Sequence, residues 1–494
     1  MITRLLVANR GEIARRIMTT CRALGIGTVA VYADADADAP HVAEADVAVR
    51  LPGSAPADTY LRADLLLAAA GRTGADAVHP GYGFLSENAA FARAVADAGL
   101  VWVGPPAAAI AAMGSKLRAK ELVVAAGVPA LPTLPADGPD SPDGPGAPAG
   151  SGFDFPLLVK ASAGGGGRGM RVVRDAGSLA GAVASARREA AAAFGEDTVF
   201  CEPWLEPCRH VEVQVVADTH GRVVALGERE CSIQRRHQKI VEETPSPAVG
   251  PVLRERLCRA AVAAAGAVGY TGAGTVEFLL APDGRFFFLE MNTRLQVEHP
   301  VTECVTGLDL VRLQLEVAEG APLGFDTPPA PRGHAIEARV YAEDPAAGWR
   351  PSTGVVSTVE VPGVVARFAP PAGHGVRLDS GVADGSTVGS HYDAMIGKVI
   401  AWAPDRPAAA RMLAAALAGA RLHGVTTNRD LLIRVLRHPD FLAGSTDTGF
   451  LDAHPEVTEP LLGAAGVRLA ALAAALAGMA GRRAGARVLG MLPP

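Results

Sequence analysis

The stretch GTVEFLLAPDGRFFFLEMNTRLQVE, residues 274–298, predicts a β-hairpin followed by a charged loop. The dipeptide Asp283-Gly284 suits the two positive-φ positions of a type I′ turn, and alternating β-prone residues flank it on both sides. If Pro282 pairs with Arg285, the residue numbers of every later pair add up to the same value. The sequence therefore predicts a hairpin with a fixed register.

The predicted register brings three oxygen-bearing side chains to one face of the hairpin. Glu277 lies directly opposite Glu290, and Asn292 follows two residues later on the same face. Like charges in this position destabilise a sheet by up to roughly 1 kcal/mol, and a divalent cation removes that cost. Two carboxylates and an amide oxygen suit Mg²⁺ better than zinc or copper. An edge hairpin whose Glu side chains point into water fits the same pattern.

Lysine is used sparingly in this chain. Lys and Arg together number 46, but lysine stands only at positions 116, 120, 160, 239 and 398. Lys160 ends the apolar strand pattern PLLVK and precedes a glycine-rich run at 164–169. Glycine N–H groups can approach phosphate oxygens closely while a lysine beside them neutralises charge. The pattern predicts a cover over a polyphosphate, although a glycine turn between two strands also fits it.

Composition limits the classes of protein that the chain can belong to. Its 494 residues, 49% of them hydrophobic, can form about two to four compact units. A net charge of −6 gives no electrostatic reason to expect a nucleic acid or an anionic membrane as partner. The six cysteines show neither zinc-site spacing nor disulfide-framework density, and no signal-like or bilayer-spanning run is visible. We therefore expect a cytoplasmic globular protein.

The order of strand and helix patterns predicts an α/β protein with several units. Strands and helices alternate over residues 1–115 and predict a parallel sheet. The turn at 9–12 carries one glycine where a dinucleotide fingerprint needs three, so nicotinamide binding is not expected. A Pro-, Gly- and Asp-rich stretch at 132–152 predicts an exposed connection. A small unit follows, with a helix expected near 177–194, and mixed strands and helices continue to about residue 454.

Eight motifs in this order resemble biotin carboxylase, the ATP-grasp component of acyl-CoA carboxylases. They are VANRGEIA, HPGYGFLSEN, KASAGGGGRGM, RHVEVQV, ERECSIQRRHQKIVEE, EMNTRLQVEHPVTE, RGHAIEAR and YDAMIGKVI. The resemblance implies a three-part ATP-grasp fold of the α/β (α+β) class. Its expected parts are an N-terminal parallel α/β domain (1–115), a linker and mobile lid (116–204), a catalytic core (205–335), a C-terminal domain (336–454) and an Ala-rich tail of uncertain role (455–494).

The resemblance also implies roles for individual residues. The positions that match ATP contacts are Lys116, Lys160, Gly166, Gly167, Met170, Glu202, Leu205, His210, Gln234 and His237. Glu277, Glu290 and Asn292 match the metal ligands, which the hairpin register groups independently. The bicarbonate pocket is matched by Lys239, Arg294, Gln296 and Val297. Glu298 matches the base that deprotonates bicarbonate, and Arg339 matches the residue that binds biotin and stabilises its enolate.

The implied reaction is the carboxylation of biotin by bicarbonate through carboxyphosphate, with ATP as co-substrate and Mg²⁺ or Mn²⁺ as cofactor. No (Ala/Val)-Met-Lys-Met sequence occurs and no lysine follows Lys398, so we expect biotin on a separate carrier protein. The expected partners are a biotin carboxyl carrier protein and a carboxyltransferase subunit of an acetyl- or propionyl-CoA carboxylase, and a second copy in a homodimer. Another ATP-grasp ligase that forms an acyl phosphate, and a non-catalytic nucleotide-binding scaffold, are the alternatives.

Overall fold

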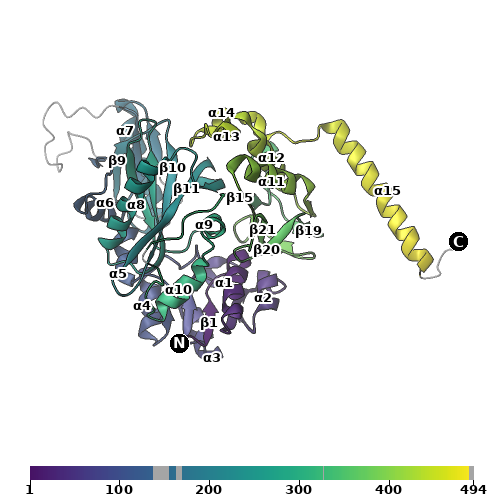
Figure 1. Cartoon of the computed structure of the whole chain (residues 1–494), viewed down its shortest axis with the longest axis horizontal. Helices are drawn as coiled ribbons and strands as arrows, with labels where there is room; N and C mark the ends of the chain where they lie inside the picture. Colours follow the sequence, from purple (N-terminus) through teal and green to yellow (C-terminus); the bar gives the residue numbers. More distant parts are fainter. Residues whose placement is uncertain (137–154, 163–169, 326, 489–494) are drawn as a thin grey trace.

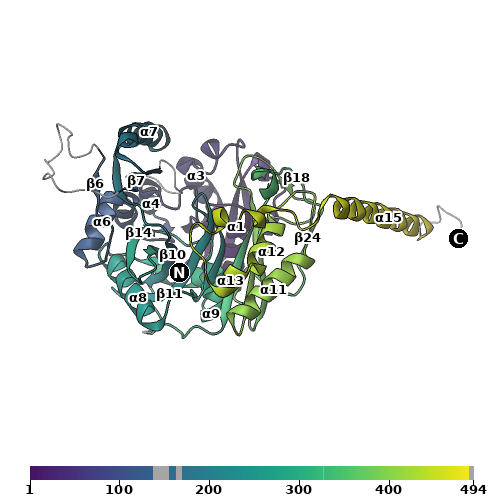
Figure 2. The ribbon, with the colours of Figure 1, turned by 90° about the horizontal axis from the view of Figure 1, so that it is seen from above.

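The computed structural model describes the chain in four stretches, residues 1–136, 155–162, 170–325 and 327–488. The predicted glycine-rich run at 164–169 lies outside them, and so does most of the predicted connection at 132–152. Three larger sheets follow one another along the described chain, with five, four and nine strands. In Figures 1 and 2, the small sheet with its helix α7 and the C-terminal helix α15 lie at opposite ends of the molecule.

The first sheet is parallel throughout, in the order β3-β2-β1-β4-β5, as the sequence predicts. Its central strand is apolar on both faces because helices cover both. Leu5 and Val7 pack with helix α1, whereas Leu6 packs with α3 and α4. The elements are β1 (Arg4–Val7), α1 (Gly11–Ala23), β2 (Gly27–Ala33), α2 (Pro40–Glu44), β3 (Val47–Leu51), α3 (Ala63–Thr73), β4 (Ala77–His79), α4 (Ala89–Asp97), β5 (Val101–Trp102), α5 (Ala107–Gly114) and α6 (Lys116–Ala125).

The second sheet is antiparallel, in the order β6-β9-β7-β8, and one long helix packs on it. The helix begins where the Asp175 carboxylate accepts a hydrogen bond from the Ser178 N–H, and it ends at Gly195, which has a φ of 75°. The expected helix near 177–194 is thus present. The elements are β6 (Leu134–Pro135), β7 (Leu157–Ala161), β8 (Arg171–Val173), α7 (Ala176–Phe194) and β9 (Val199–Pro203).

The third sheet carries most of the predicted site residues. Its order is β14-β13-β10-β11-β12-β15-β23-β21-β20, and all neighbours are antiparallel except β20 and β21. Strand β15 (His334–Tyr341) crosses the boundary expected at residue 335, so the sheet is continuous there. The other strands are β10 (Arg209–Ala217), β11 (Val223–Arg235), β12 (Gln238–Thr244), β13 (Gly272–Leu280), β14 (Phe286–Asn292), β20 (Val364–Arg367), β21 (Gly375–Ser380) and β23 (Met395–Ala403).

Helices and three small strand pairs complete this region. The helices are α8 (Pro251–Gly266), α9 (His299–Thr306), α10 (Leu310–Ala318), α11 (Arg406–Gly419), α12 (Arg429–Arg437), α13 (Pro439–Ala443) and α14 (Phe450–Ala453). The strand pairs are β16 (Glu343–Asp344) with β17 (Arg350–Pro351), β18 (Gly354–Val355) with β22 (Thr387–Val388), and β19 (Thr358–Glu360) with β24 (Arg421–His423).

The last helix, α15 (Ala464–Val488), points away from the rest of the molecule, as Figure 1 shows. Its larger apolar side chains, such as Leu469 and Leu472, are exposed. None of the described helices combines the length and the apolar character needed to cross a bilayer.

Candidate active site

The predicted hairpin is formed by β13 and β14, and Glu277 pairs with Glu290 as expected. The predicted type I′ turn, however, is wrong. The Ala281 N–H donates to the Arg285 carbonyl (2.8 Å) across a three-residue loop in which only Gly284 is left-handed, with a φ of 80°. This loop shifts the register by one residue, and a β-bulge next to Glu277 shifts it back. The correct pairing therefore results from two irregularities that cancel.

A row of directly paired charged residues crosses four neighbouring strands of the large sheet. Arg229 on β11 pairs with Glu212 on β10, Glu212 with Glu277 on β13, and Glu277 with Glu290 on β14. Residues paired in this way point to the same face of a sheet. Arg229 donates to Glu212 and, at 2.8 Å, to Gln214, and both charged side chains are fully buried. Three carboxylates in one row need further positive charge.

Lys239 on β12 supplies that charge at the centre of the row. Its ammonium group donates to Glu212, to Glu277 at 2.9 Å and to Glu298 at 2.7 Å. Burial is the largest influence and lowers the pKa of Lys239, but the charges of these carboxylates outweigh it and raise the pKa well above its usual value. Lys239 therefore stays protonated and links a predicted metal ligand, Glu277, to the predicted base, Glu298.

Glu298 lies at the end of the charged loop and is fully buried. It accepts hydrogen bonds from Lys239 and, at 2.9 Å, from the Arg339 guanidinium. Burial raises the pKa of Glu298, but these two cations outweigh it and lower the pKa well below the usual range, so the carboxylate is ionised. Arg339 also donates to Glu242, whose pKa burial raises to about 7, with a further contribution from the charge of Glu298.

Arg294 holds the loop in place from its other end. Its guanidinium donates to Glu87 at 2.9 Å, to the Asn292 side-chain oxygen at 2.7 Å and to the Gln296 side-chain oxygen at 2.8 Å. Gln296 in turn donates to Glu277 at 2.9 Å. The predicted bicarbonate residues Arg294 and Gln296 are thus connected by hydrogen bonds to the predicted metal ligands, and Glu87 from the HPGYGFLSEN motif is a contact that the sequence analysis missed.

Lys398 on β23 fixes the backbone of the same loop. Its ammonium group donates to the Val297 carbonyl at 2.7 Å and lies 3.2 Å from a carboxylate oxygen of Glu12 on α1. Glu12 also accepts a hydrogen bond from the Tyr82 hydroxyl. We assigned Lys398 no role from the sequence, although the scarcity of lysine in this chain was an available signal, and the structure shows its side chain fully buried. These contacts join the N-terminal unit to the loop.

Glu202 on β9, a predicted ATP contact, is paired with two lysines. Lys160 on β7 and Lys120 on α6 both bond to its carboxylate. Burial raises the pKa of Glu202, but the two lysines outweigh it and lower the pKa below its usual value. Directly after β9, the Trp204 N–H donates to the Pro156 carbonyl at 2.9 Å. Lys120 is another contact that was not predicted from the sequence.

Two other groups predicted to contact phosphates, His210 and Lys116, interact with the metal-ligand pair, and His237 is a further predicted nucleotide contact. His210 Nε2 lies 2.7 Å from a Glu277 oxygen. Burial lowers the pKa of His210, but Glu277 outweighs it and raises the pKa above the usual value. Burial lowers the pKa of Lys116, at the start of α6, and the charge of Glu290 opposes this shift. His237, left-handed with a φ of 69°, has a pKa lowered by burial and by the charge of His210.

The remaining predicted ATP contacts are described only in part. Gln234 pairs with Lys239 across the β11–β12 hairpin. Leu205 follows β9 and Met170 precedes β8, and both are half-buried. Gly166 and Gly167 lie outside the described residues, so their contacts stay predictions.

The donor set on the hairpin fits a hard divalent cation. Burial and the charge of Glu277 raise the pKa of Glu290. A cation between the two carboxylates would lower this pKa again. One Glu277 oxygen already accepts hydrogen bonds from Lys239, Asn292 (2.8 Å) and Gln296. Asn292 presents its NH₂ group to Glu277, so it must rotate before its amide oxygen can bind metal. Oxygen ligands of this kind suit Mg²⁺ or Mn²⁺.

Family models match three consecutive parts of the chain. They are "Biotin carboxylase, N-terminal domain" at residues 1–110, "Carbamoyl-phosphate synthase L chain, ATP binding domain" at 116–325 and "Biotin carboxylase C-terminal domain" at 337–453. A biotin carboxylase from Nostoc sp. is 45% identical over 449 residues, which cover 91% of this chain and 98% of that protein. The mitochondrial methylcrotonoyl-CoA carboxylase subunit alpha of Dictyostelium discoideum is 46% identical over 92% of this chain, but the match covers only 64% of that longer protein.

Solved structures agree with these matches. The biotin carboxylase domain dimer of Hydrogenobacter thermophilus 2-oxoglutarate carboxylase, in complex with MgADP, ADP and bicarbonate, has a TM-score of 0.86 at 40% identity and covers 94% of this chain and 100% of that chain. The biotin carboxylase of Campylobacter jejuni in complex with β-γ-ATP has a TM-score of 0.84 at 40% identity, with coverages of 92% and 99%. These findings confirm the predicted resemblance and the ATP-grasp fold, and the chain belongs to the biotin carboxylase family of ATP-dependent ligases.

Proposed function

We propose that this chain uses ATP to activate bicarbonate as carboxyphosphate and then carboxylates biotin that a carrier protein presents. One observation supports this most strongly. The Lys239 ammonium group bonds both to Glu277, a proposed metal ligand, and to Glu298, the proposed base. A single cation thus connects the proposed site of phosphoryl transfer to the proposed site of bicarbonate deprotonation. An enzyme that must do both to one bicarbonate ion needs this proximity.

In the first step the bicarbonate oxygen attacks the γ-phosphorus of ATP and ADP leaves. Phosphoryl transfer depends mainly on positioning and on neutralising charge. Lys116, Lys160 and His210 are the proposed phosphate contacts. Glu277, Glu290 and Asn292 would hold Mg²⁺. The metal would supply positive charge that offsets the negative charge developing during phosphoryl transfer.

Glu298 is the proposed base for the bicarbonate proton. Its pKa is low because Lys239 and Arg339 both donate hydrogen bonds to it. A bound bicarbonate ion would draw these two cations toward its own oxygens and would add a negative charge nearby. Both effects raise the pKa of Glu298 and make it a stronger base. Arg294, Gln296 and the backbone of Val297 are the proposed remaining contacts to bicarbonate.

Arg339 is the proposed contact for biotin in the second step. Carboxyphosphate breaks down to CO₂ and phosphate, the phosphate takes the N1 proton of biotin, and N1 then attacks the carbon of CO₂. The negative charge that develops on the biotin ureido oxygen is matched by a planar guanidinium that stays charged. Arg339 donates to Glu242 through Nε and to Glu298 through Nη2, and the two bonds together orient the guanidinium plane.

The proposed partners are a biotin carboxyl carrier protein, a carboxyltransferase subunit and a second copy of this chain. The choice of acyl-CoA is a property of the carboxyltransferase, and we propose an acetyl- or propionyl-CoA carboxylase. The similarity to methylcrotonoyl-CoA carboxylase alpha subunits adds methylcrotonoyl-CoA as a second candidate. Reconstitution with each class of carboxyltransferase, followed by assays with the three acyl-CoA esters, distinguishes these possibilities.

The function is tested by phosphate release from Mg-ATP in degassed buffer, with and without bicarbonate and with and without free biotin. The proposal predicts that release requires bicarbonate and rises further when biotin is added. Phosphate release that depends on neither bicarbonate nor biotin would instead indicate a different ATP-grasp ligase.

A further inference from the structure

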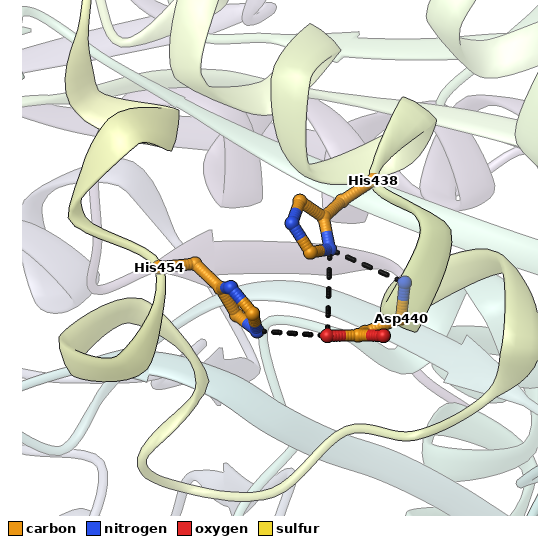
Figure 3. A group of neighbouring side chains, drawn as sticks. All are labelled: His438, Asp440 and His454. Atoms are coloured by element: carbon orange, nitrogen blue, oxygen red, sulfur yellow. Dashed lines mark hydrogen bonds and ion pairs between the residues drawn. The ribbon is translucent and has the colours of Figure 1, made fainter.

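A group of metal-ligating side chains lies far along the chain from the candidate active site, near the start of α15. His438 caps the N-terminus of α13, Asp440 lies in the first turn of that helix, and His454 directly follows α14. One ligand atom from each lies within 4.8 Å of the other two. Figure 3 shows His438 and His454 facing the Asp440 carboxylate from two sides. His454 Nε2 lies 3.1 Å and His438 Nδ1 lies 4.0 Å from the same Asp440 oxygen.

A second carboxylate contacts the opposite side of both imidazole rings. One Glu456 oxygen lies 3.4 Å from His438 Nε2 and 3.4 Å from His454 Nδ1. Each ring therefore directs one nitrogen toward Asp440 and its other nitrogen toward Glu456. Histidines that bind a metal through one nitrogen usually donate the other N–H to a carboxylate, which fixes the tautomer and strengthens the ligand. The position of Glu456 matches this supporting role for both rings at once.

We propose that His438 Nδ1, His454 Nε2 and an Asp440 oxygen bind a zinc ion, with Glu456 orienting the two imidazoles. Two imidazoles and a carboxylate suit Zn²⁺ and similar transition metals, whereas Mg²⁺ prefers oxygen ligands alone. Three protein ligands leave a fourth tetrahedral position for water. The ion would tie α13 to the segment between α14 and α15.

The proposed site competes with one existing hydrogen bond. His438 Nδ1 accepts from the Asp440 N–H at 3.2 Å, and the same lone pair would bind the metal. A coordination bond to the ion would replace this hydrogen bond, and His438 Nδ1, now 4.0 Å from the Asp440 oxygen, would have to move nearer to it. Side-chain exposures of 17% for His438 and 22% for His454 leave the group accessible to an ion from solvent.

Calorimetric titration of ZnCl₂ into the chelator-treated full chain tests the proposal. Because His210 and Glu277 in the candidate active site could also bind zinc, the site is identified by comparing variants. His454→Ala should lose one zinc equivalent or bind it at least about 100-fold more weakly, and Asp440→Asn should weaken the same event. His423→Ala, which removes a histidine outside the group, should bind like the unchanged protein. Identical isotherms for all four proteins would overturn the proposal.

Glu456→Gln separates a metal site from a hydrogen-bonded group. The proposal predicts unchanged stoichiometry with a zinc affinity about 10- to 100-fold lower. Melting temperatures in chelator and in zinc provide the second readout, since zinc should raise the melting temperature of the unchanged protein and of His423→Ala but not that of His454→Ala. Equal zinc-induced shifts in all variants would contradict the assignment, whatever the effect of each substitution on folding without metal.

Discussion

Replacing Glu298 by Gln should abolish most bicarbonate-dependent ATP cleavage while leaving the fold and nucleotide binding intact. The side chain keeps its shape, but it loses its charge and can no longer accept a proton from bicarbonate. Removal of a positioned general base typically lowers the rate by about 10²- to 10⁴-fold, or about 2.7 to 5.5 kcal/mol of transition-state stabilisation.

The surrounding charges indicate that the variant should fold. Lys239 keeps Glu212 and Glu277 as partners, and Arg339 keeps Glu242. The charge of Glu298 is also one of the influences that raise the pKa of Glu242 to about 7. Once that charge is removed, the pKa of Glu242 falls, so Glu242 becomes more fully ionised and replaces part of the lost negative charge. We therefore expect a loss of stability well below the 3–5 kcal/mol typical of breaking a buried ion pair.

The assay is steady-state phosphate release at several bicarbonate concentrations, with ADP affinity and melting temperature measured on the same samples. Glu242→Gln is the matched control, because it removes another buried carboxylate beside Arg339 without touching Lys239. It should retain bicarbonate-dependent ATP cleavage within about tenfold of the unchanged protein. If Glu298→Gln also retains bicarbonate-dependent ATP cleavage within about tenfold of the unchanged protein and binds ADP normally, Glu298 is not the base.

Four further variants, one of them compared in a pH series, test the rest of the site. Glu290→Ala should abolish metal-dependent ATP turnover, because one metal ligand is removed and Glu277 no longer faces a second carboxylate. Adding Mg²⁺ should then no longer stimulate phosphate release. Arg339→Ala should reduce biotin carboxylation at least about tenfold more than bicarbonate-dependent ATP cleavage; equal losses argue against its role at the biotin enolate. The pKa of Glu290 is raised, and only its ionised form binds metal. The Mg²⁺ affinity, measured by titration, should therefore fall as the pH is lowered, and the fall should begin above the pH at which an ordinary glutamate protonates. Glu290→Gln should show a weaker pH dependence of Mg²⁺ affinity. Lys398→Met should raise the KM for bicarbonate about tenfold or more without changing ADP affinity, since the Val297 carbonyl loses its ammonium donor; an unchanged KM would show that the loop does not need it.

The sequence predicts which strands pair better than it predicts the residue register or the geometry of the turn. Alternation of apolar residues fixed the strands β13 and β14, and the pairing of Glu277 with Glu290 is confirmed. The turn itself was not predictable from Asp283-Gly284 alone, because the same dipeptide fits a two-residue loop and a three-residue loop with a bulge. The first, parallel sheet was predictable for a similar reason, since its strands are short apolar runs separated by helical patterns.

The missed contacts of the site share one physical cause, which is that they join segments distant in sequence. Glu12 and Lys398 meet only because α1 packs near β23, and Glu87 reaches Arg294 across 207 positions. No local pattern encodes such contacts. Glu212 was detectable in principle, because a charged residue in the middle of the apolar strand pattern RHVEVQV is unfavourable unless it is paired. Its partner, Arg229, could not be identified before the strand order was known.

The most direct test of the proposed chemistry follows the oxygen atoms of bicarbonate. Bicarbonate labelled with ¹⁸O is mixed with the full chain, Mg-ATP and biotin, and the released phosphate is examined by mass spectrometry before label exchanges with water. Carboxyphosphate formation predicts that each phosphate released carries one ¹⁸O atom from bicarbonate. Unlabelled phosphate would mean that water attacks ATP, and it would contradict the proposal that this chain activates bicarbonate.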